Sequence, residues 1–222
     1  MRKLKYLLPL MLSILLTSPV LLCAGTWFTV RWISDGDTIV LANGERVRYN
    51  GINAPEIAHA EHSKSAEPHG NAAKNFNIKL VNAKKVRLEF DAKRRDRYGR
   101  LLAYVFLSDG TFVNVKMVAN GVAYYLPGTV ENNRYGKLLL KAQREAMTAA
   151  KGMWRDLNEN GESYIGNRHS KRFHLKTCPF GKKIKKQNRI PLAGSREAFW
   201  AGYAPAKKCI EISELIRRSD TF

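Results

Sequence analysis

Two short segments of the chain carry the residue types that phosphate chemistry requires. Asp35-Gly36-Asp37-Thr38 places two carboxylates on one tight turn, and carboxylate oxygens are the ligands that Ca²⁺ and Mg²⁺ prefer. Arg48 follows within an apolar run, five residues before Asn53-Ala54-Pro55-Glu56. A guanidinium can hold a phosphate through two hydrogen bonds, and a glutamate can take a proton from water. Together these segments suggest hydrolysis of a phosphate ester.

A third segment, Asp96-Arg97-Tyr98-Gly99-Arg100, stands directly before an alternating apolar run. Arg100 would give a second phosphate contact, and Tyr98 offers a face on which a base can stack. Each segment alone also has a simpler interpretation, as a polar turn, an ion pair beside a proline-bounded turn, or a solvated basic loop. Phosphodiester hydrolysis needs a cation, a base for water and donors for the transition-state charge, and the three segments together offer all of these.

The order and spacing of these segments resemble those of the staphylococcal nuclease (thermonuclease) family. The resemblance runs from about Thr29 to Trp154 and includes Leu88-Glu89-Phe90-Asp91, Asp109-Gly110, Val113-Asn114 and Gly121-Val122-Ala123. It implies an OB-fold enzyme that binds one Ca²⁺, with Mg²⁺ the less favoured cation, and that cuts DNA and RNA to leave 3′-phosphates.

The resemblance also implies a metal site. By position, Asp37 would be a direct ligand, Asp35 an outer-shell ligand, and Ala54 would lend its backbone carbonyl oxygen. The chain departs from the family at Asn53, where an aspartate ligand is usual. Asparagine still offers an oxygen but lacks the charge, so we expect weak calcium binding.

Catalytic and substrate-binding roles follow from the same positions. Glu56 would be the general base, and Arg48 and Arg100 would stabilise the pentacoordinate phosphorus. Tyr98, together with Tyr124 or Tyr125, would line the nucleotide pocket. The alternative is an OB-fold protein that binds nucleic acid without cutting it. Binding alone, however, does not require the combination of Glu56 with Arg48 and Arg100.

Short strands followed by helices must position these residues. Strand-like runs occur at residues 27–33, 38–41, 46–49, 86–90 and 102–106, and helical spacing occurs at 70–81, 113–119 and about 135–150. Asn43-Gly44 lies between two of the strand-like runs and is a hairpin signal. This pattern predicts an α+β fold, mainly β, built as a five-stranded OB-fold barrel with about three helices and a small C-terminal module.

The charge is concentrated towards the C-terminus. The chain has 38 Lys and Arg against 19 Asp and Glu, and residues 166–222 hold 14 of the bases but only four of the acids. Such an excess favours a polyanionic partner, here DNA or RNA. We therefore predict a nuclease-like barrel at residues 26–157 and a basic module at 166–215 that grips nucleic acid, in a monomeric protein.

Three residues of the basic module could bind metal. His174, Cys178 and Cys209 lie in a pattern that resembles the small zinc-binding module of bacterial alkyl-phosphotriester DNA-repair proteins. That module normally ends in Cys-x-x-Cys, whereas this chain has Ala206-Lys207-Lys208-Cys209 and so lacks one ligand. A disulfide or an unmetallated remnant is therefore favoured over bound Zn²⁺.

The first 25 residues have the pattern of an export signal. Arg2, Lys3 and Lys5 precede an apolar stretch from Leu7 to Leu22, and Cys23-Ala24-Gly25 offers small residues for cleavage. We predict a periplasmic or secreted protein. A lipid anchor on Cys23 and a retained membrane anchor are the alternatives, and the latter underlies a third interpretation as an envelope-anchored structural protein.

Overall fold

The structure is a computed structural model that describes residues 26–58, 66–129, 133–159 and 161–216. The predicted export signal at residues 1–25 lies outside these ranges. Within them, every helix is too short or too polar to cross a membrane.

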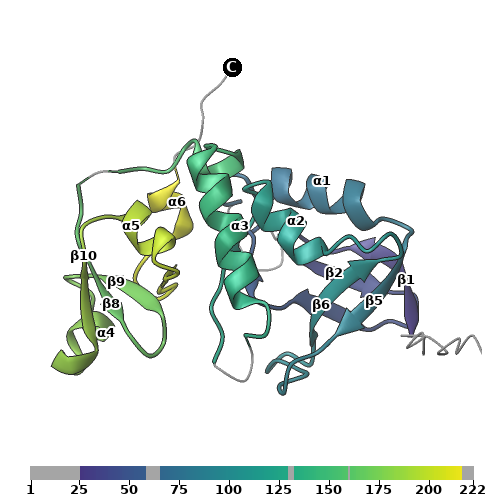
Figure 1. Cartoon of the computed structure of the whole chain (residues 1–222), viewed down its shortest axis with the longest axis horizontal. Coiled ribbons are helices and arrows are strands. Elements are labelled where there is room, and N and C mark those ends of the chain that lie inside the picture. Colours follow the sequence, from purple (N-terminus) through teal and green to yellow (C-terminus); the bar gives the residue numbers. More distant parts are fainter. Residues whose placement is uncertain (1–25, 59–65, 130–132, 160, 217–222) are drawn as a thin grey trace, which may run out of the picture.

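A closed barrel of five strands forms the first part of the molecule (Figure 1). Its strands are β1 (Trp27–Ile33), β2 (Thr38–Leu41), β3 (Arg46–Tyr49), β5 (Lys85–Glu89) and β6 (Leu101–Leu107). They follow one another around the barrel in the order β1, β2, β3, β6, β5, and the β3–β6 pair alone is parallel. The predicted five-stranded barrel is confirmed, as is the hairpin between β2 and β3.

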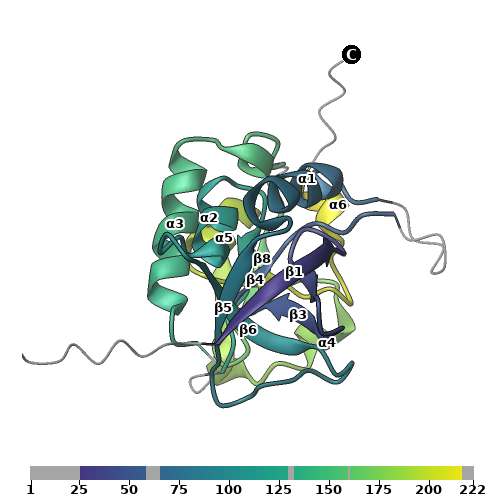
Figure 2. The same cartoon turned by 90° about the vertical axis from the view of Figure 1, so that its right-hand side faces the viewer.

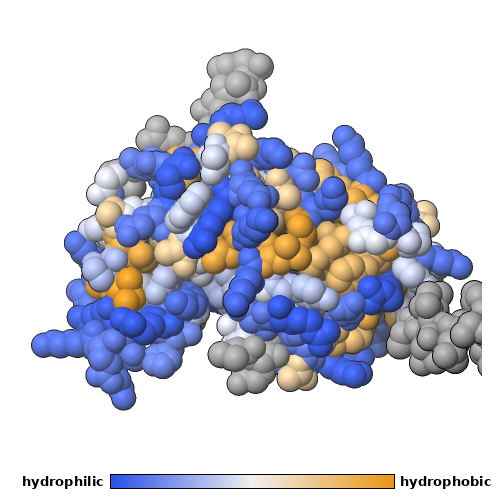
Figure 3. Space-filling model, viewed as in Figure 1, coloured by the Kyte–Doolittle hydropathy of each residue, from blue (hydrophilic) through white to orange (hydrophobic). Residues whose placement is uncertain are grey.

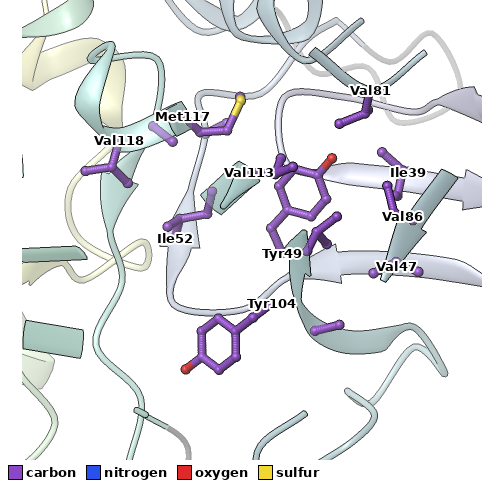
Figure 4. Packing of buried hydrophobic residues seen from close by; sticks show 14 of the residues in the cluster. Ile39, Val47, Tyr49, Ile52, Val81, Val86, Tyr104, Val113, Met117 and Val118 are labelled. Carbon is purple, nitrogen blue, oxygen red and sulfur yellow. The ribbon is translucent and has the colours of Figure 1, made fainter. Parts of the chain in front are cut away.

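Three helices cover one side of the barrel, as Figure 2 shows. They are α1 (Gly70–Val81), α2 (Val113–Ala119) and α3 (Gly136–Thr148), so the predicted helices are present and differ only at the ends of the third. A short pair, β4 (Ile52–Asn53) with β7 (Tyr124–Tyr125), lies beside the barrel. Figure 4 shows part of the core, a single buried cluster to which Ile39 and Val47 of the strands and Val113 and Met117 of α2 belong.

The C-terminal module, which we define as residues 164–216, is built around a second sheet. Its strands are β8 (Tyr164–Asn167), β9 (Arg172–Leu175), β10 (Arg189–Leu192) and β11 (Ala204–Pro205), in the order β10, β8, β9, β11. Short helices complete it: α4 (Pro179–Lys182), the 3₁₀ turn η4 (Lys186–Asn188), α5 (Ser195–Trp200) and α6 (Ile212–Leu215). Hydrophilic side chains gather over the part that carries α4 (Figure 3), where Lys182, Lys183, Lys185 and Lys186 are exposed.

The module shares a hydrophobic core with the helical side of the barrel. Tyr124, Met147 and Trp154, the last from the 3₁₀ turn η3 (Gly152–Trp154), are buried in one cluster with Phe173 and Phe199 of the module. Helix α3 stands between the two sheets (Figure 1). Its Gln143 accepts a hydrogen bond from the Tyr125 amide (2.7 Å) and donates one to the Phe199 carbonyl oxygen (2.6 Å). The C-terminal module is therefore packed against the barrel.

Candidate active site

The two aspartates of the first segment are buried side by side in the turn between β1 and β2. The Asp37 amide donates to Asp35 Oδ1 at 2.9 Å. Gly36 lets this turn approach its neighbours, because a Cβ atom on it would lie 2.5 Å from the Ala54 Cβ and 2.7 Å from the Ala73 Cβ. The turn thus packs directly on Ala54, and any larger residue at position 36 would push the carboxylates away from it.

Asp37 is the centre of a polar network. Its Oδ2 accepts from the Ala54 amide (2.7 Å) and from Arg48 Nη2 (2.8 Å). Burial raises the pKa of Asp37 to about 7; the Arg48 guanidinium acts to lower this pKa, and the carboxylates of Asp35 and Glu56 raise it further. Negative charge is therefore crowded into a buried position, where a bound cation would be stabilised.

Arg48 is held in place by backbone carbonyls. Its Nη1 donates to the carbonyl oxygens of Tyr49 and Ile52, each at 2.9 Å, and its Nη2 donates to Asn53 Oδ1 at 2.9 Å. The Asn53 Nδ2 in turn donates to the Ala54 carbonyl oxygen at 2.9 Å. Asn53 thus joins Arg48 to Ala54, and its role as a metal ligand stays a prediction.

The donor set near this turn fits a hard divalent cation. The carboxylates of Asp35 and Asp37 and the Ala54 carbonyl offer oxygens only, which is the ligand type of calcium. Asp35 Oδ1 is used by the Asp37 amide, whereas Asp35 Oδ2 accepts no hydrogen bond from any residue in the described ranges. Asp35, Asp37 and Ala54 are therefore the residues that would hold the ion.

Glu56 lies three residues after β4 on a braced stretch of backbone. Its amide donates to Glu67 Oε2 (2.7 Å), and the Glu67 amide donates to the Glu56 carbonyl oxygen (2.9 Å). Gly70 packs so closely on that carbonyl that any Cβ atom there would collide with it. The side chain is 38% exposed, and its Oε1 lies 3.2 Å from Lys207 Nζ of the C-terminal module. A carboxylate on a fixed backbone with an exposed side chain suits a general base.

Arg100 directly precedes β6, the strand that pairs with the Arg48 strand β3. β3 and β6 run parallel with Arg48 opposite Leu102, and Arg100 is two residues before that partner. The guanidinium is paired with Asp96, whose Oδ2 accepts from Nε (2.8 Å) and Nη2 (2.7 Å). Among the described residues no hydrogen bond or ion pair joins Arg100 to Arg48 or Glu56, so a phosphate would have to compete with Asp96 for this group.

The three predicted substrate tyrosines differ in exposure. Tyr98 is 66% exposed, with the Arg97 guanidinium 4.7 Å from its ring centroid. Tyr124 is 1% exposed, and its ring packs edge-on against Phe199 at 5.5 Å between centroids. Tyr125 is also buried, and its hydroxyl donates to Asn133 Oδ1 at 3.0 Å. Tyr98 is therefore the most accessible of the three, and the substrate-binding role of all three tyrosines stays a prediction.

Cys178 and Cys209 form a disulfide, with their Cα atoms 5.9 Å apart. His174 Nδ1 lies 3.5 Å from Cys178 Sγ, and burial lowers the pKa of this histidine. Because the thiolate is the form that binds metal, the paired cysteines offer no zinc ligand in this state. The structure thus shows the disulfide among the alternatives that the sequence left open.

Several supporting residues were not predicted. Asn77 is fully buried, accepts from the Tyr49 hydroxyl (2.8 Å) and donates to the Asp35 carbonyl oxygen (3.2 Å), so it anchors the aspartate turn. Glu67 and Gly70 fix the backbone of Glu56, and Asp96 orients Arg100. The pairing of Asp96 with Arg100 could be suspected from the sequence, because the two residues are only four positions apart. The contacts of Asn77 and Glu67 join distant segments and appear only in the folded chain.

Comparisons with known proteins identify the family. A family model described as staphylococcal nuclease homologue matches residues 46–156. A thermonuclease of Staphylococcus intermedius is 38% identical over 136 residues, covering 59% of this chain and 77% of the relative. A thermonuclease of Staphylococcus hyicus is 34% identical over 135 residues (58% and 75%), and endonuclease YncB of Bacillus subtilis is 36% identical over 138 residues (60% and 62%).

Proposed function

The chain belongs to the staphylococcal nuclease homologue family and is an enzyme that hydrolyses nucleic acids, and we propose its mode of action from this premise. It is an exported, calcium-dependent nuclease that cuts DNA, RNA or both and leaves 3′-phosphate ends. The observation that carries the proposal is the buried pair Asp35 and Asp37. Asp37 accepts hydrogen bonds from the Ala54 amide and from Arg48. Export is supported by the pattern of residues 1–25.

The residues of the site divide the reaction between them. Asp35, Asp37 and the Ala54 carbonyl would hold calcium, which when bound supplies positive charge beside the phosphate. Arg48 and Arg100 donate hydrogen bonds to phosphoryl oxygens, whose charge grows in the transition state. These two arginines therefore stabilise the transition state more than the bound substrate.

Glu56 accepts the proton of the attacking water. The water oxygen forms a bond to phosphorus, and the bond from phosphorus to the 5′-oxygen of the next nucleotide breaks. The phosphate stays on the 3′-oxygen, and the leaving 5′-oxygen takes a proton from solvent. The exposed side chain of Glu56 on its braced backbone suits this role.

Cleavage of plasmid DNA and of RNA by protein lacking residues 1–25 tests the proposal. We expect cleavage with calcium, weaker cleavage with Mg²⁺ and none in EDTA. Undiminished cleavage in EDTA would refute the metal dependence. Binding without cleavage under every condition would instead favour the alternative of a non-catalytic nucleic-acid-binding protein.

A further inference from the structure

Lys207 brings a positive charge from the C-terminal module to the candidate general base. It is the second residue after β11, in the sequence Pro205-Ala206-Lys207. Its Nζ is 3.2 Å from Glu56 Oε1, although the two residues are 151 positions apart. The two side chains are 55% and 38% exposed, so this ion pair is weakly held and can exchange for another partner.

The backbone that carries Lys207 is fixed. The Ala206 amide donates to the Phe173 carbonyl oxygen of β9 (2.9 Å), and the Cys209 and Ile210 amides both donate to the Ala206 carbonyl oxygen (2.8 and 3.1 Å). Cys209 is further tied by its disulfide to Cys178. The lysine therefore extends a flexible side chain from a rigid turn.

Lys207 and Glu56 face a common hollow of about 340 Å³ at the junction of the barrel and the module. Its lining contains three carboxylates, those of Glu56, Glu67 and Glu211, and includes the buried Tyr124. Among the described residues that line this hollow, Lys207 is the one with a positive charge. A nucleic-acid strand that entered here would be repelled by the carboxylates and attracted by this lysine.

The position of Glu56 also limits where the reacting phosphate can lie. A general base works within about 3 Å of the water it activates, and that water lies roughly 3–3.5 Å from phosphorus. The phosphorus is then within about 6–7 Å of the Glu56 carboxylate. An ammonium 3.2 Å from that carboxylate can reach the same phosphate or its neighbour along the strand.

We propose that Lys207 is a substrate-binding residue, which leaves Glu56 when nucleic acid binds and contacts a backbone phosphate of the strand. The C-terminal module then forms one wall of the active site. The exchange also frees Glu56 Oε1 to accept the proton of water. This inference rests on the proposed nuclease function and adds to it a residue outside the matched family segment, which ends at residue 156.

The test compares Lys207→Ala, Lys207→Arg and Lys208→Ala, all in protein lacking residues 1–25. Lys208 is the matched control, since it is the next residue and its Nζ lies 5.0 Å from the Phe180 ring centroid, outside the hollow. The substrate is a labelled single-stranded oligonucleotide at saturating calcium. We expect Lys207→Ala to raise KM about fivefold while kcat stays within about twofold, because one phosphate contact contributes about 1 kcal/mol. Lys207→Arg should restore KM, and Lys208→Ala should leave it unchanged.

Binding of the same oligonucleotide in EDTA separates this inference from the nuclease proposal. Lys207→Ala should weaken binding about fivefold and lower the salt slope by about 0.7, whether or not the protein cleaves. Equal affinity of wild type and Lys207→Ala would overturn the inference even in an active nuclease. A lower kcat of Lys207→Ala with an unchanged KM would also overturn the inference, because it would show that Lys207 only orients Glu56. A higher kcat of this variant would overturn it as well, because it would show that Lys207 inhibits Glu56.

Discussion

Removal of the C-terminal module tests whether the barrel depends on it. A truncated protein of residues 26–157 is compared with a protein of residues 26–222. In the structure this deletion uncovers Tyr124, Met147 and Trp154, which are buried in the cluster shared with Phe199. It also removes the Phe199 carbonyl oxygen that accepts a hydrogen bond from Gln143.

The magnitude follows from the buried side chains. Full burial of a large apolar side chain contributes about 1.5–3 kcal/mol. If each of the three is about half uncovered, the free energy of unfolding falls by roughly 2–5 kcal/mol. That is a large part of the about 5–15 kcal/mol typical of a native protein. At about 2–4 °C per kcal/mol for a chain of this size, the Tm should fall by roughly 5–20 °C.

Thermal unfolding in calcium-free buffer, followed by circular dichroism, measures the effect. The control replaces Lys182, Lys183, Lys185 and Lys186 by glutamine, which removes charge from exposed positions but leaves the shared core intact. This control should keep its Tm within about 2 °C while its nucleic-acid affinity becomes less sensitive to salt. A truncated protein with an unchanged Tm would refute the shared core, and the module would then be an independent attachment.

Three further predictions concern the candidate active site. Arg100→Ala should lower kcat by roughly two orders of magnitude and leave oligonucleotide affinity nearly unchanged. Arg97→Ala is the control. Equal loss of binding and rate in Arg100→Ala would contradict the role of Arg100 in stabilising the transition state. Asn53→Asp should lower the calcium midpoint of activity by about tenfold for each 1.4 kcal/mol of calcium-binding free energy gained. The reason is that the added charge outweighs the one hydrogen bond lost to Ala54. An unchanged midpoint would remove this residue from the metal site. Burial raises the pKa of Asp37 to about 7 from 3.8, so the metal-free protein should lose stability as pH rises between these values. Protons then compete with calcium, and the calcium midpoint of activity should rise up to tenfold for each pH unit below about pH 7. A calcium midpoint that is flat from about pH 5 to 8 would contradict this.

The barrel was predictable because its signals are local. Alternation along the strands, the Asn43-Gly44 turn and the helical spacing of Gly70–Val81 each depend on neighbours in the sequence. The helices α1 and α2 have the bounds that this spacing indicates. The segments of the candidate site could be found in the same way, because each is only a few residues long.

Other features depend on contacts between distant segments and were missed. The strands of the C-terminal module are two to four residues long and lie among many lysines, so they give little alternation to detect. The burial of Tyr124 by Phe199 and the pairing of Glu56 with Lys207 join segments that only the folded chain brings together. Asn53 was predicted as a ligand from its position, whereas its hydrogen bonds to Arg48 and Ala54 appear only in the structure.

Single-turnover cleavage of an end-labelled oligonucleotide by wild type and Glu56→Gln, at saturating calcium, tests the central claim most directly. Glutamine keeps the shape of the side chain but cannot take the proton, so we expect the rate to fall by roughly 100-fold or more with binding retained. The wild-type products should carry 3′-phosphates. A Glu56→Gln variant that cleaves at the wild-type rate, or products that carry 5′-phosphates, would contradict the assignment of this site and its reaction.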